Sequence, residues 1–496
     1  MRLASRSPAI SLVSLLIMLF GSGSVTLASQ QSLPPPPFTS QTASSWADDA
    51  VCYEVFVRSF ADSDGDGIGD FSGLTERLDY VNDGDPATGT DLGATCIWLM
   101  PIMEAASYHG YDVTDYYAVE QDYGTLDDFR DFIAAAHDRG IQVILDLVLN
   151  HTSSEHPWFQ EALRHPASPY RDWYIFEPED PGYPGPWGAD AWHRSPVGDE
   201  FYYGIFWEGM PDLNYRNPAV TQEARRISDF WLNEMGADGF RLDAIKHLIE
   251  DGRVQENTPE THEWLRQYRG WLDQNAPEAV TIGEIFGASS FLLNEYYPDQ
   301  LHLYFQFEIG QQILATANYG TAADLTTITA ETIETLPDQR WAPFLTNHDQ
   351  ERSMTTLGGD LQEAKLAATA LLTMPGLPFI YYGEEIGMTG DKPDELIRTP
   401  MQWTAAENGG FTTGQPWEPL PADRATANVA VQESDPGSLL NHYRRLIRLH
   451  TGHPALAHGD LVPLKTGNPA CAAFLRTTAE ESVLVFLNVG KEHATG

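Results

Sequence analysis

Three short apolar segments of the chain are each followed by a carboxylate. Asp243 follows Gly239–Leu242, Glu284 follows Thr281–Gly283, and Asp349 comes shortly after Phe344–Leu345. Carboxylates that meet at one place repel each other and lose hydration, so a fold tolerates them more readily where chemistry needs them. A pair with one ionised and one protonated member is what glycoside hydrolysis requires.

Arg241 separates the roles of these carboxylates. It lies two residues before Asp243, so in a strand both side chains point to the same side. A guanidinium beside Asp243 would hold that carboxylate ionised, as a nucleophile must be. Glu284 would then remain protonated and act as a general acid.

The elements that would position these groups are short apolar strands alternating with amphipathic helices such as Leu126–Arg139 and Thr221–Met235. Continuous apolar strands with helices between them indicate a parallel sheet covered by helices. Eight strands predict an α/β fold of the (β/α)8 TIM barrel type, in which catalytic groups lie at the C-terminal ends of the strands. The predicted strands are Val51–Val57, Cys96–Met100, Gln142–Leu147, Gly239–Leu242, Thr281–Gly283, Leu303–Phe307, Phe344–Leu345 and Phe379–Tyr382.

The barrel is predicted to be interrupted once. Residues 151–215 are rich in Pro, Gly, Trp and Tyr and are too many for an ordinary loop, so we interpret them as an inserted domain after the third strand. The barrel then comprises residues 47–150 and 216–436. Residues 437–496 hold a last helix and the start of a C-terminal β domain, and their small number leaves open whether that domain is complete.

The N-terminus has the features of a secretion signal. Arg2 and Arg6 precede an apolar stretch, Ala9–Phe20, that is too short to span a bilayer comfortably, and Thr26–Ala28 offers a cleavage site. We expect residues 1–28 to be a cleaved signal peptide of a secreted protein, the alternative being an uncleaved anchor. Residues 29–46, rich in Ser, Gln, Thr and Pro, are predicted to be a disordered linker.

The composition excludes some partners. The net charge of −42 over 496 residues argues against nucleic acid and against an anionic membrane surface. The acidity fits either adaptation to salt or an ordinary acidic extracellular protein, and we expect a monomer. Three cysteines form no disulfide framework. Cys52 and Cys96 lie on predicted neighbouring strands, where one bridge is possible, but two buried thiols are the state we expect.

Four segments together resemble the signature regions of the α-amylase family of glycoside hydrolases, in the family's order. They are Asp146–His151, Gly239–His247, Gly283–Ile285 and Asn347–Asp349. Met210–Asn214 resembles a fifth region, in the form seen in amylases intermediate between the usual amylases and the oligo-1,6-glucosidase and neopullulanase groups.

The resemblance implies a retaining double displacement on an α-glucan, with Asp243 as nucleophile, Glu284 as acid and base, and Asp349 stabilising the transition state. It also implies substrate-binding residues around the sugar before the cleaved bond, and Lys246 and His247 at the sugar beyond it, which favours an endo-acting α-amylase. The binding residues implied are His109, Tyr111, Asp112, His151, Arg241, Lys246, His247 and His348.

A second motif, Asp62–Asp70, alternates carboxylates with glycines, a pattern that suits Ca²⁺. An EF-hand is excluded because Gly73 stands where that loop carries its bidentate glutamate. A similar loop in the family binds calcium, which implies Asp62, Asp64, Asp66, Asp70 and the Ile68 carbonyl as ligands; the alternative is a solvated acidic turn. A second calcium is possible at Asn150, with Asp190 or Asp212 and the His247 carbonyl.

Other functions remain open. The same catalytic residues serve α-glucosidases, cyclomaltodextrinases, transglycosylases and trehalose synthases, which fold and carboxylates cannot separate. A non-catalytic glucan-binding protein would lack one or more of the three carboxylates. A calcium-dependent adhesion module would give those carboxylates no purpose.

Overall fold

The structure is a computed structural model that describes residues 18–20 and 46–491. Most of the predicted signal peptide and linker lies outside these residues. In the described part, no helix is long and apolar enough to cross a membrane.

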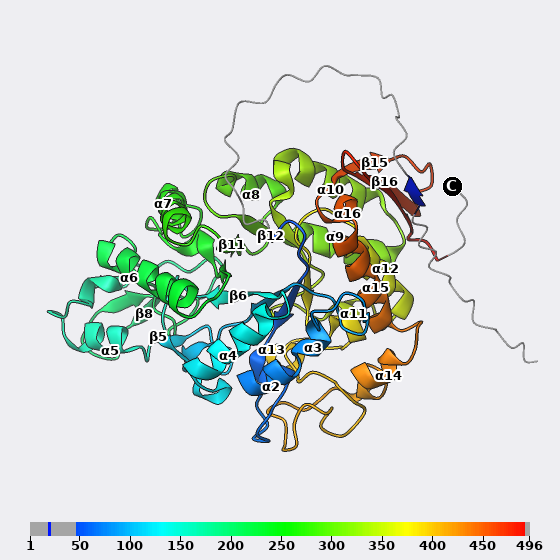
Figure 1. Cartoon of the computed structure of the whole chain (residues 1–496). Coiled ribbons are helices and arrows are strands. Elements are labelled where there is room, and N and C mark those ends of the chain that lie inside the picture. The colour runs from blue at the N-terminus through cyan, green and yellow to red at the C-terminus, as the bar shows by residue number, and fades with distance from the viewer. Residues whose placement is uncertain (1–17, 21–45, 492–496) are drawn as a thin grey trace, which may run out of the picture.

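The centre of the molecule is a parallel barrel, as predicted (Figure 1). Its eight strands lie in the order β13-β12-β11-β10-β6-β3-β2-β14, and a parallel bridge between Phe344 and Phe379 joins the two ends of the sheet. The strands are β2 Cys52–Val55, β3 Cys96–Leu99, β6 Gln142–Leu147, β10 Gly239–Leu242, β11 Val280–Gly283, β12 Leu303–Gln306, β13 Trp341–Pro343 and β14 Phe379–Tyr381.

The seventh strand differs from the prediction. Its ladder with β12 runs over Trp341–Pro343, not over Phe344–Leu345. The prediction began this strand at Phe344. Proline cannot donate to a ladder. Here the proline ends the ladder, where a missing donor matters least.

Helices surround the barrel, and polar residues at their first positions explain several of their starts. Thr125 and Asp128 form a reciprocal capping box at α4, and Thr258 and Ser438 cap α7 and α15. The helices are α1 Val57–Phe60, α2 Phe71–Glu76, α3 Leu78–Val81, α4 Leu126–His137, α5 Pro157–Arg164, α6 Pro218–Asp229, α7 Pro259–Asn275, α8 Ser290–Tyr296, α9 Phe307–Tyr319, α10 Ala323–Thr335, α11 Ser353–Thr356, α12 Leu361–Leu371, α13 Asp394–Ile397, α14 Val429–Glu433, α15 Leu439–Gly452 and α16 Pro454–Ala457.

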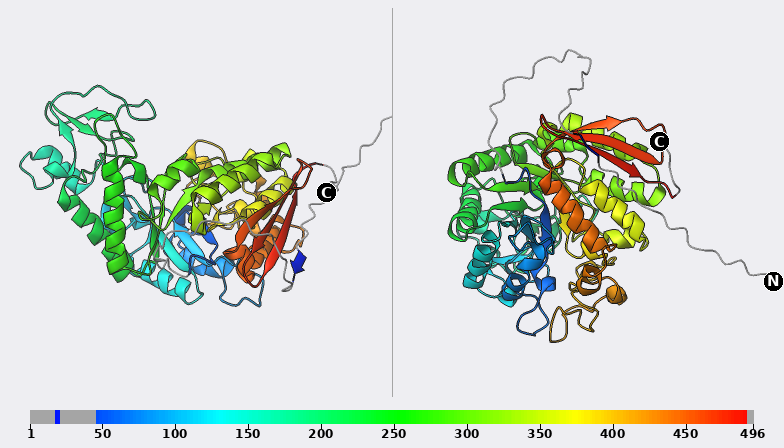
Figure 2. Two further views of the ribbon diagram at one scale, coloured as in Figure 1. Left: turned by 90° about the horizontal axis from the view of Figure 1, so that it is seen from above. Right: turned by 45° about the vertical axis from the view of Figure 1, so that its right-hand side comes forward.

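The segment between β6 and α6 forms the inserted domain, which projects from one end of the barrel (Figure 2). It contains α5 and a small antiparallel sheet in the order β7-β9-β8, with β7 Phe176–Glu177, β8 Trp192–Arg194 and β9 Phe201–Tyr203. Ala191, Trp192, Tyr203 and Ile205 give it a small core of its own. Before it, β4 Met103–Ala105 and β5 Val113–Val119 form a hairpin that follows β3.

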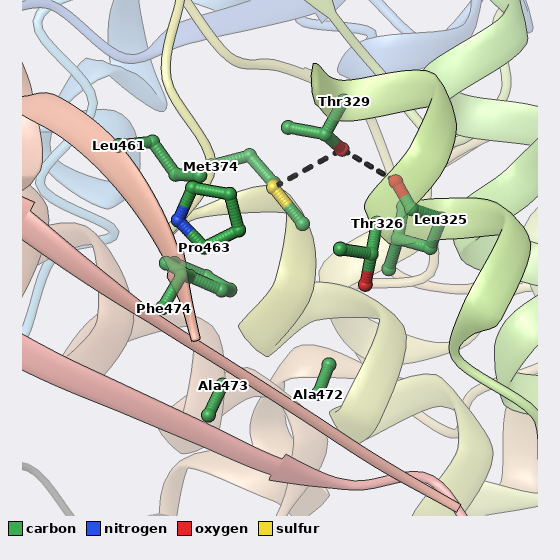
Figure 3. A pocket seen from close by; sticks show the side chains of 9 residues that line it. All are labelled: Leu325, Thr326, Thr329, Met374, Leu461, Pro463, Ala472, Ala473 and Phe474. Carbon is green, nitrogen blue, oxygen red and sulfur yellow. Dashed lines mark hydrogen bonds between the residues drawn. The ribbon is translucent and has the colours of Figure 1, made fainter. Parts of the chain in front are cut away.

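The C-terminal residues form an antiparallel sheet of β15 Asp460–Leu464, β16 Cys471–Thr477 and β17 Ser482–Asn488, and β1 Met18–Phe20 pairs with β17. This sheet packs beside α10, where Thr329 Oγ donates to the Leu325 carbonyl and contacts Met374 (Figure 3). The cavity at this seam, about 10 Å³, has room for one water at most, so it is no ligand site.

The expectation of two buried thiols at Cys52 and Cys96 was wrong, because the two residues form a disulfide. They are direct register partners on β2 and β3, which brings their Cα atoms to 4.3 Å. Cys471 is a free, buried thiol. The sequence placed the two strands side by side but could not give their register.

Candidate active site

Arg241 lies at the centre of the predicted site and is almost fully buried. Its Nη1 is 2.8 Å from Asp146 Oδ1 and 2.7 Å from Asp243 Oδ1. The pairing of β10 with β6 sets Arg241 directly opposite Asp146. Burial raises the pKa of Asp146 to about 6, although Arg241 opposes the rise. Asp146 lay within a signature segment but was not among the predicted site residues.

Glu284 lies on the other side of Arg241, at 3.8 Å from its Nη2. Glu284 Oε2 accepts a hydrogen bond of 2.9 Å from the backbone N–H of Ala244. Ala244 has a φ of 49°, in the left-handed region, and such strain concentrates at functional sites. Burial raises the pKa of Glu284 to about 7, against the effect of Arg241 and with that of Asp243. This carboxyl group can therefore carry a proton near neutral pH.

Asp349 lies in a different environment, with 40% of its side chain exposed. Its Oδ1 accepts from Arg398 Nη2 at 2.9 Å, and its Oδ2 is 3.3 Å from His348 Nε2. The partial burial of Asp349 acts to raise its pKa, but His348 and Arg398 outweigh this effect and leave the pKa below its ordinary value. Asp349 is thus held ionised while Glu284 is not.

A buried chain of hydrogen bonds supports this side of the site. His348 Nδ1 lies 2.6 Å from Glu54 Oε1, its Nε2 lies 2.5 Å from the Tyr111 hydroxyl, and that hydroxyl donates to Asp146 Oδ2 at 3.0 Å. Burial opposes protonation of His348, yet Asp349 and Glu54 raise its pKa above the ordinary value. A protonated His348 donates to both Glu54 and Tyr111.

The other residues predicted on this side hold Tyr111 in place. His151 Nε2 is 3.1 Å from the Tyr111 carbonyl, and His109 Nδ1 accepts from the Tyr111 N–H at 3.1 Å. Asp112 accepts from the backbone and hydroxyl of Ser107. Two of these histidines therefore bind the backbone of Tyr111, and Asp112 has a role inside the turn.

Lys246 and His247 lie on the Glu284 side. Lys246 Nζ is 2.9 Å from Glu256 Oε2 and 3.4 Å from the carbonyl of Phe286, two residues after Glu284. Burial lowers the pKa of His247 to about 4, so the ring is neutral and its Nδ1 donates to the Gln255 carbonyl at 2.8 Å.

Glu54 and Arg398 belong to the site but were not predicted. Glu54 is on β2, and Arg398 follows α13, far along the chain from the groups they contact. The position of Glu54 on the first strand was a weak signal, whereas Arg398 stood in no predicted strand.

The acidic loop forms a compact turn between α1 and α2. Carboxylate oxygens of Asp62, Asp64 and Asp70 lie within 4.8 Å of one another. Three backbone N–H groups, of Asp64, Gly65 and Gly67, donate to Asp62, and Gly65 and Gly67 take φ values of +88° and +100°. Three of the four predicted aspartates thus converge, while Asp66 accepts from the Ile68 N–H instead.

At the predicted second metal position, Asn150 and Asp212 meet. Asn150 Nδ2 donates to Asp212 Oδ2 at 3.1 Å, and the buried Asn150 Oδ1 has no hydrogen-bond partner among the described residues. Asp190 is instead paired with Pro184 in a short bridge of the inserted domain. The unpartnered oxygen is an atom that a cation could take as a ligand.

The barrel and its strand-end carboxylates define the class of a glycoside hydrolase, and the comparisons with known proteins agree. The family model "Alpha amylase, catalytic domain" matches residues 54–459. The chain is 40% identical to Alpha-amylase 3 of Dictyoglomus thermophilum over 90% of this chain and 86% of that protein. It is 34% identical to the trehalose synthase/amylase TreS of Mycolicibacterium smegmatis, over 89% and 82%. A crystal structure of an α-amylase from H. orenii matches with a TM-score of 0.82 and 42% identity, over 89% and 90% of the two chains.

The chain therefore belongs to the α-amylase family of glycoside hydrolases.

Proposed function

We propose that this enzyme is a retaining endo-α-amylase that cleaves internal α-1,4 bonds of starch, glycogen or maltooligosaccharides. One observation carries the assignment of roles: Arg241 pairs with Asp243, while Glu284, bonded to the Ala244 N–H, has a pKa of about 7. One carboxylate thus pairs with a cation beside another that can hold a proton, which is the arrangement that retaining hydrolysis needs.

The reaction proceeds in two displacements. Glu284 gives its proton to the glycosidic oxygen while Asp243 attacks the anomeric carbon, so the bond to the leaving chain breaks and a glycosyl ester forms. Glu284, now ionised, takes a proton from water, which attacks the same carbon and releases Asp243. Asp349, held ionised by Arg398 and His348, stabilises the positive charge that develops on the sugar ring.

Calcium is proposed to stabilise the loop that follows α1. Asp62, Asp64, Asp66, Asp70 and the Ile68 carbonyl would hold it, and three of these carboxylates converge already. The loop packs closely on another segment, since a Cβ at Gly67 would lie 1.9 Å from the Gln415 carbonyl. A bound cation would neutralise the acidic cluster and fix this contact. Asn150, Asp212 and the His247 carbonyl are the proposed ligands of a second ion.

The first test is chromatography of the products from soluble starch, with the anomeric configuration followed by NMR. A retaining endo-amylase gives mixed short maltooligosaccharides released in the α form. Release of glucose alone, or cleavage of isomaltose with starch spared, would contradict this proposal and favour an exo-glucosidase or an α-1,6-glucosidase.

A second candidate is isomerisation of maltose to trehalose, which the similarity to the mycobacterial trehalose synthase/amylase favours. Incubation with maltose separates the two candidate functions, because an isomerase forms a non-reducing disaccharide and an amylase does not.

Secretion is also proposed from the N-terminal sequence. Finding the mature protein outside the cells with a new N-terminus near Ser29 would support it, and retention of the whole segment would contradict it.

A further inference from the structure

Trp187 is an exposed aromatic residue on a rigid turn of the inserted domain. Its side chain is 53% exposed, although large apolar rings are ordinarily covered. The Gly185 N–H donates to the Ala189 carbonyl at 2.7 Å, and the Gly188 N–H donates to the Gly185 carbonyl at 3.0 Å. Gly188 has a φ of +81°, which favours glycine. The turn fixes the backbone that carries the indole, so a ligand would lose little entropy by ordering this segment.

A row of rings connects Trp187 with the candidate active site. The indole stacks on Phe206 with ring centroids 5.2 Å apart and an interplanar angle of 27°. Phe206 lies against His151 at 5.1 Å and against His247 at 6.0 Å, and Trp187 itself contacts His247 at 5.4 Å. The inner end of the row therefore contacts two predicted sugar-binding residues, and the outer end is open to solvent.

The position of the row relative to Glu284 indicates on which side of the cleaved bond it lies. The general acid lies beside the leaving chain, because its proton goes to the glycosidic oxygen. Lys246 reaches the Phe286 carbonyl on the segment after Glu284, and His247 is its neighbour in the chain. Asp349, His348 and Tyr111 form the other side. Phe206 contacts His151 as well as His247 and so lies between the two sides, whereas the Trp187 ring contacts His247 and thus lies on the side of the leaving chain.

We propose that the Trp187 indole, supported by Phe206, is a stacking platform for a glucose unit of the leaving chain. The inference rests on the proposed function and adds that the inserted domain selects glucans long enough to reach this ring. The C–H face of a glucose unit is apolar and matches the indole in size, so stacking removes both surfaces from water.

Two substrates isolate this contact. Maltoheptaose places glucose units on both sides of the cleaved bond, whereas α-maltotriosyl fluoride has a fluoride leaving group and no leaving chain. The variants are Trp187→Ala, Trp187→Phe and a matched control, Trp207→Ala. Trp207 is 49% exposed in the same domain but packs over Gly209. We expect Trp187→Ala to lower kcat/KM for maltoheptaose about tenfold and to change it less than about twofold for the fluoride.

Trp187→Phe should restore most of the loss, and Trp207→Ala should leave both substrates within about twofold of the wild type. An unchanged kcat/KM for maltoheptaose in Trp187→Ala, or an equal fall with both substrates, overturns the inference. If the wild type transfers glucosyl groups and does not hydrolyse maltoheptaose, the proposed function fails separately. The inference is then decided by the KM for maltose as acceptor, which Trp187→Ala must raise; an unchanged KM overturns it.

Discussion

Arg241 and Asp146 face each other across β10 and β6 as direct register partners, with Nη1 at 2.8 Å and 2.9 Å from the two carboxylate oxygens. The same guanidinium also holds Asp243. Asp146 thus fixes the cation that pairs with the proposed nucleophile, and it does so from within the barrel.

Asp146→Asn should destabilise the protein, because it leaves the charge of a buried arginine less compensated. We expect the free energy of unfolding in urea to fall by about 3 kcal/mol. Asp127→Asn is the control, since Asp127 forms an ion pair of the same length with Arg130 but at the surface, where such pairs contribute little. Equal unfolding midpoints for the two variants would contradict a central role for the Arg241–Asp146 pair.

Glu284→Gln should abolish acid catalysis and spare the fold. An amide oxygen can still accept the Ala244 N–H, so the melting temperature should stay close to that of the wild type. We expect kcat on starch to fall about 10³-fold, within the usual range for loss of a general acid. Glu263→Gln, on the exposed side of α7, is the control and should be fully active. A Glu284→Gln enzyme with near-normal kcat would assign the acid to another group.

The pH profile of kcat/KM should have an alkaline limb that reports the ionisation of Glu284. Burial raises the pKa of Glu284 to about 7, so kcat/KM on maltoheptaose should fall as the pH rises through about 7. With α-maltotriosyl fluoride, whose leaving group needs no proton, the limb should weaken or move to higher pH. A limb of identical position and depth with both substrates would show that it reports another group.

The free energy of unfolding should also fall as the pH rises, because of Glu284. A carboxyl group with a raised pKa in the folded protein adds stability below its ordinary pKa, and this is lost as the pH rises through about 7. As the pH rises through about 7, the free energy of unfolding should therefore fall less in Glu284→Gln than in the wild type. The same loss in both proteins would contradict this expectation.

The central part of the site could be predicted because parallel strands end at one face of a barrel. Strand positions carry no distances, yet the common location of Asp243, Glu284 and Arg241 follows from strand position and the two-residue period alone. Glu54 and Arg398 could not be predicted in the same way. Their contacts with His348 and Asp349 depend on how the barrel closes and on a loop of irregular structure.

The disulfide and the seventh strand show a related limit of prediction from sequence. Apolar runs locate strands, but register depends on the pairing partners, and both Cys52–Cys96 and Trp341–Pro343 are questions of register. Burial, likewise, decides which carboxylate keeps its proton. The prediction assigned Glu284 that role from the position of Arg241, while the raised pKa comes mainly from desolvation.

Removal of calcium should lower stability through the Asp62–Asp70 loop. Unscreened repulsion between the converging carboxylates would return, so a chelator should lower the melting temperature of the wild type. Asp62→Asn should bind one equivalent of calcium less by metal analysis and should respond less to the chelator. Asp83→Asn is the matched control, since Asp83 likewise accepts a backbone N–H, from Asp85, in an exposed acidic turn outside the cluster. A chelator effect of the same size in Asp62→Asn, with unchanged metal content, would place the ion elsewhere, and Asn150→Ala would then test the second position.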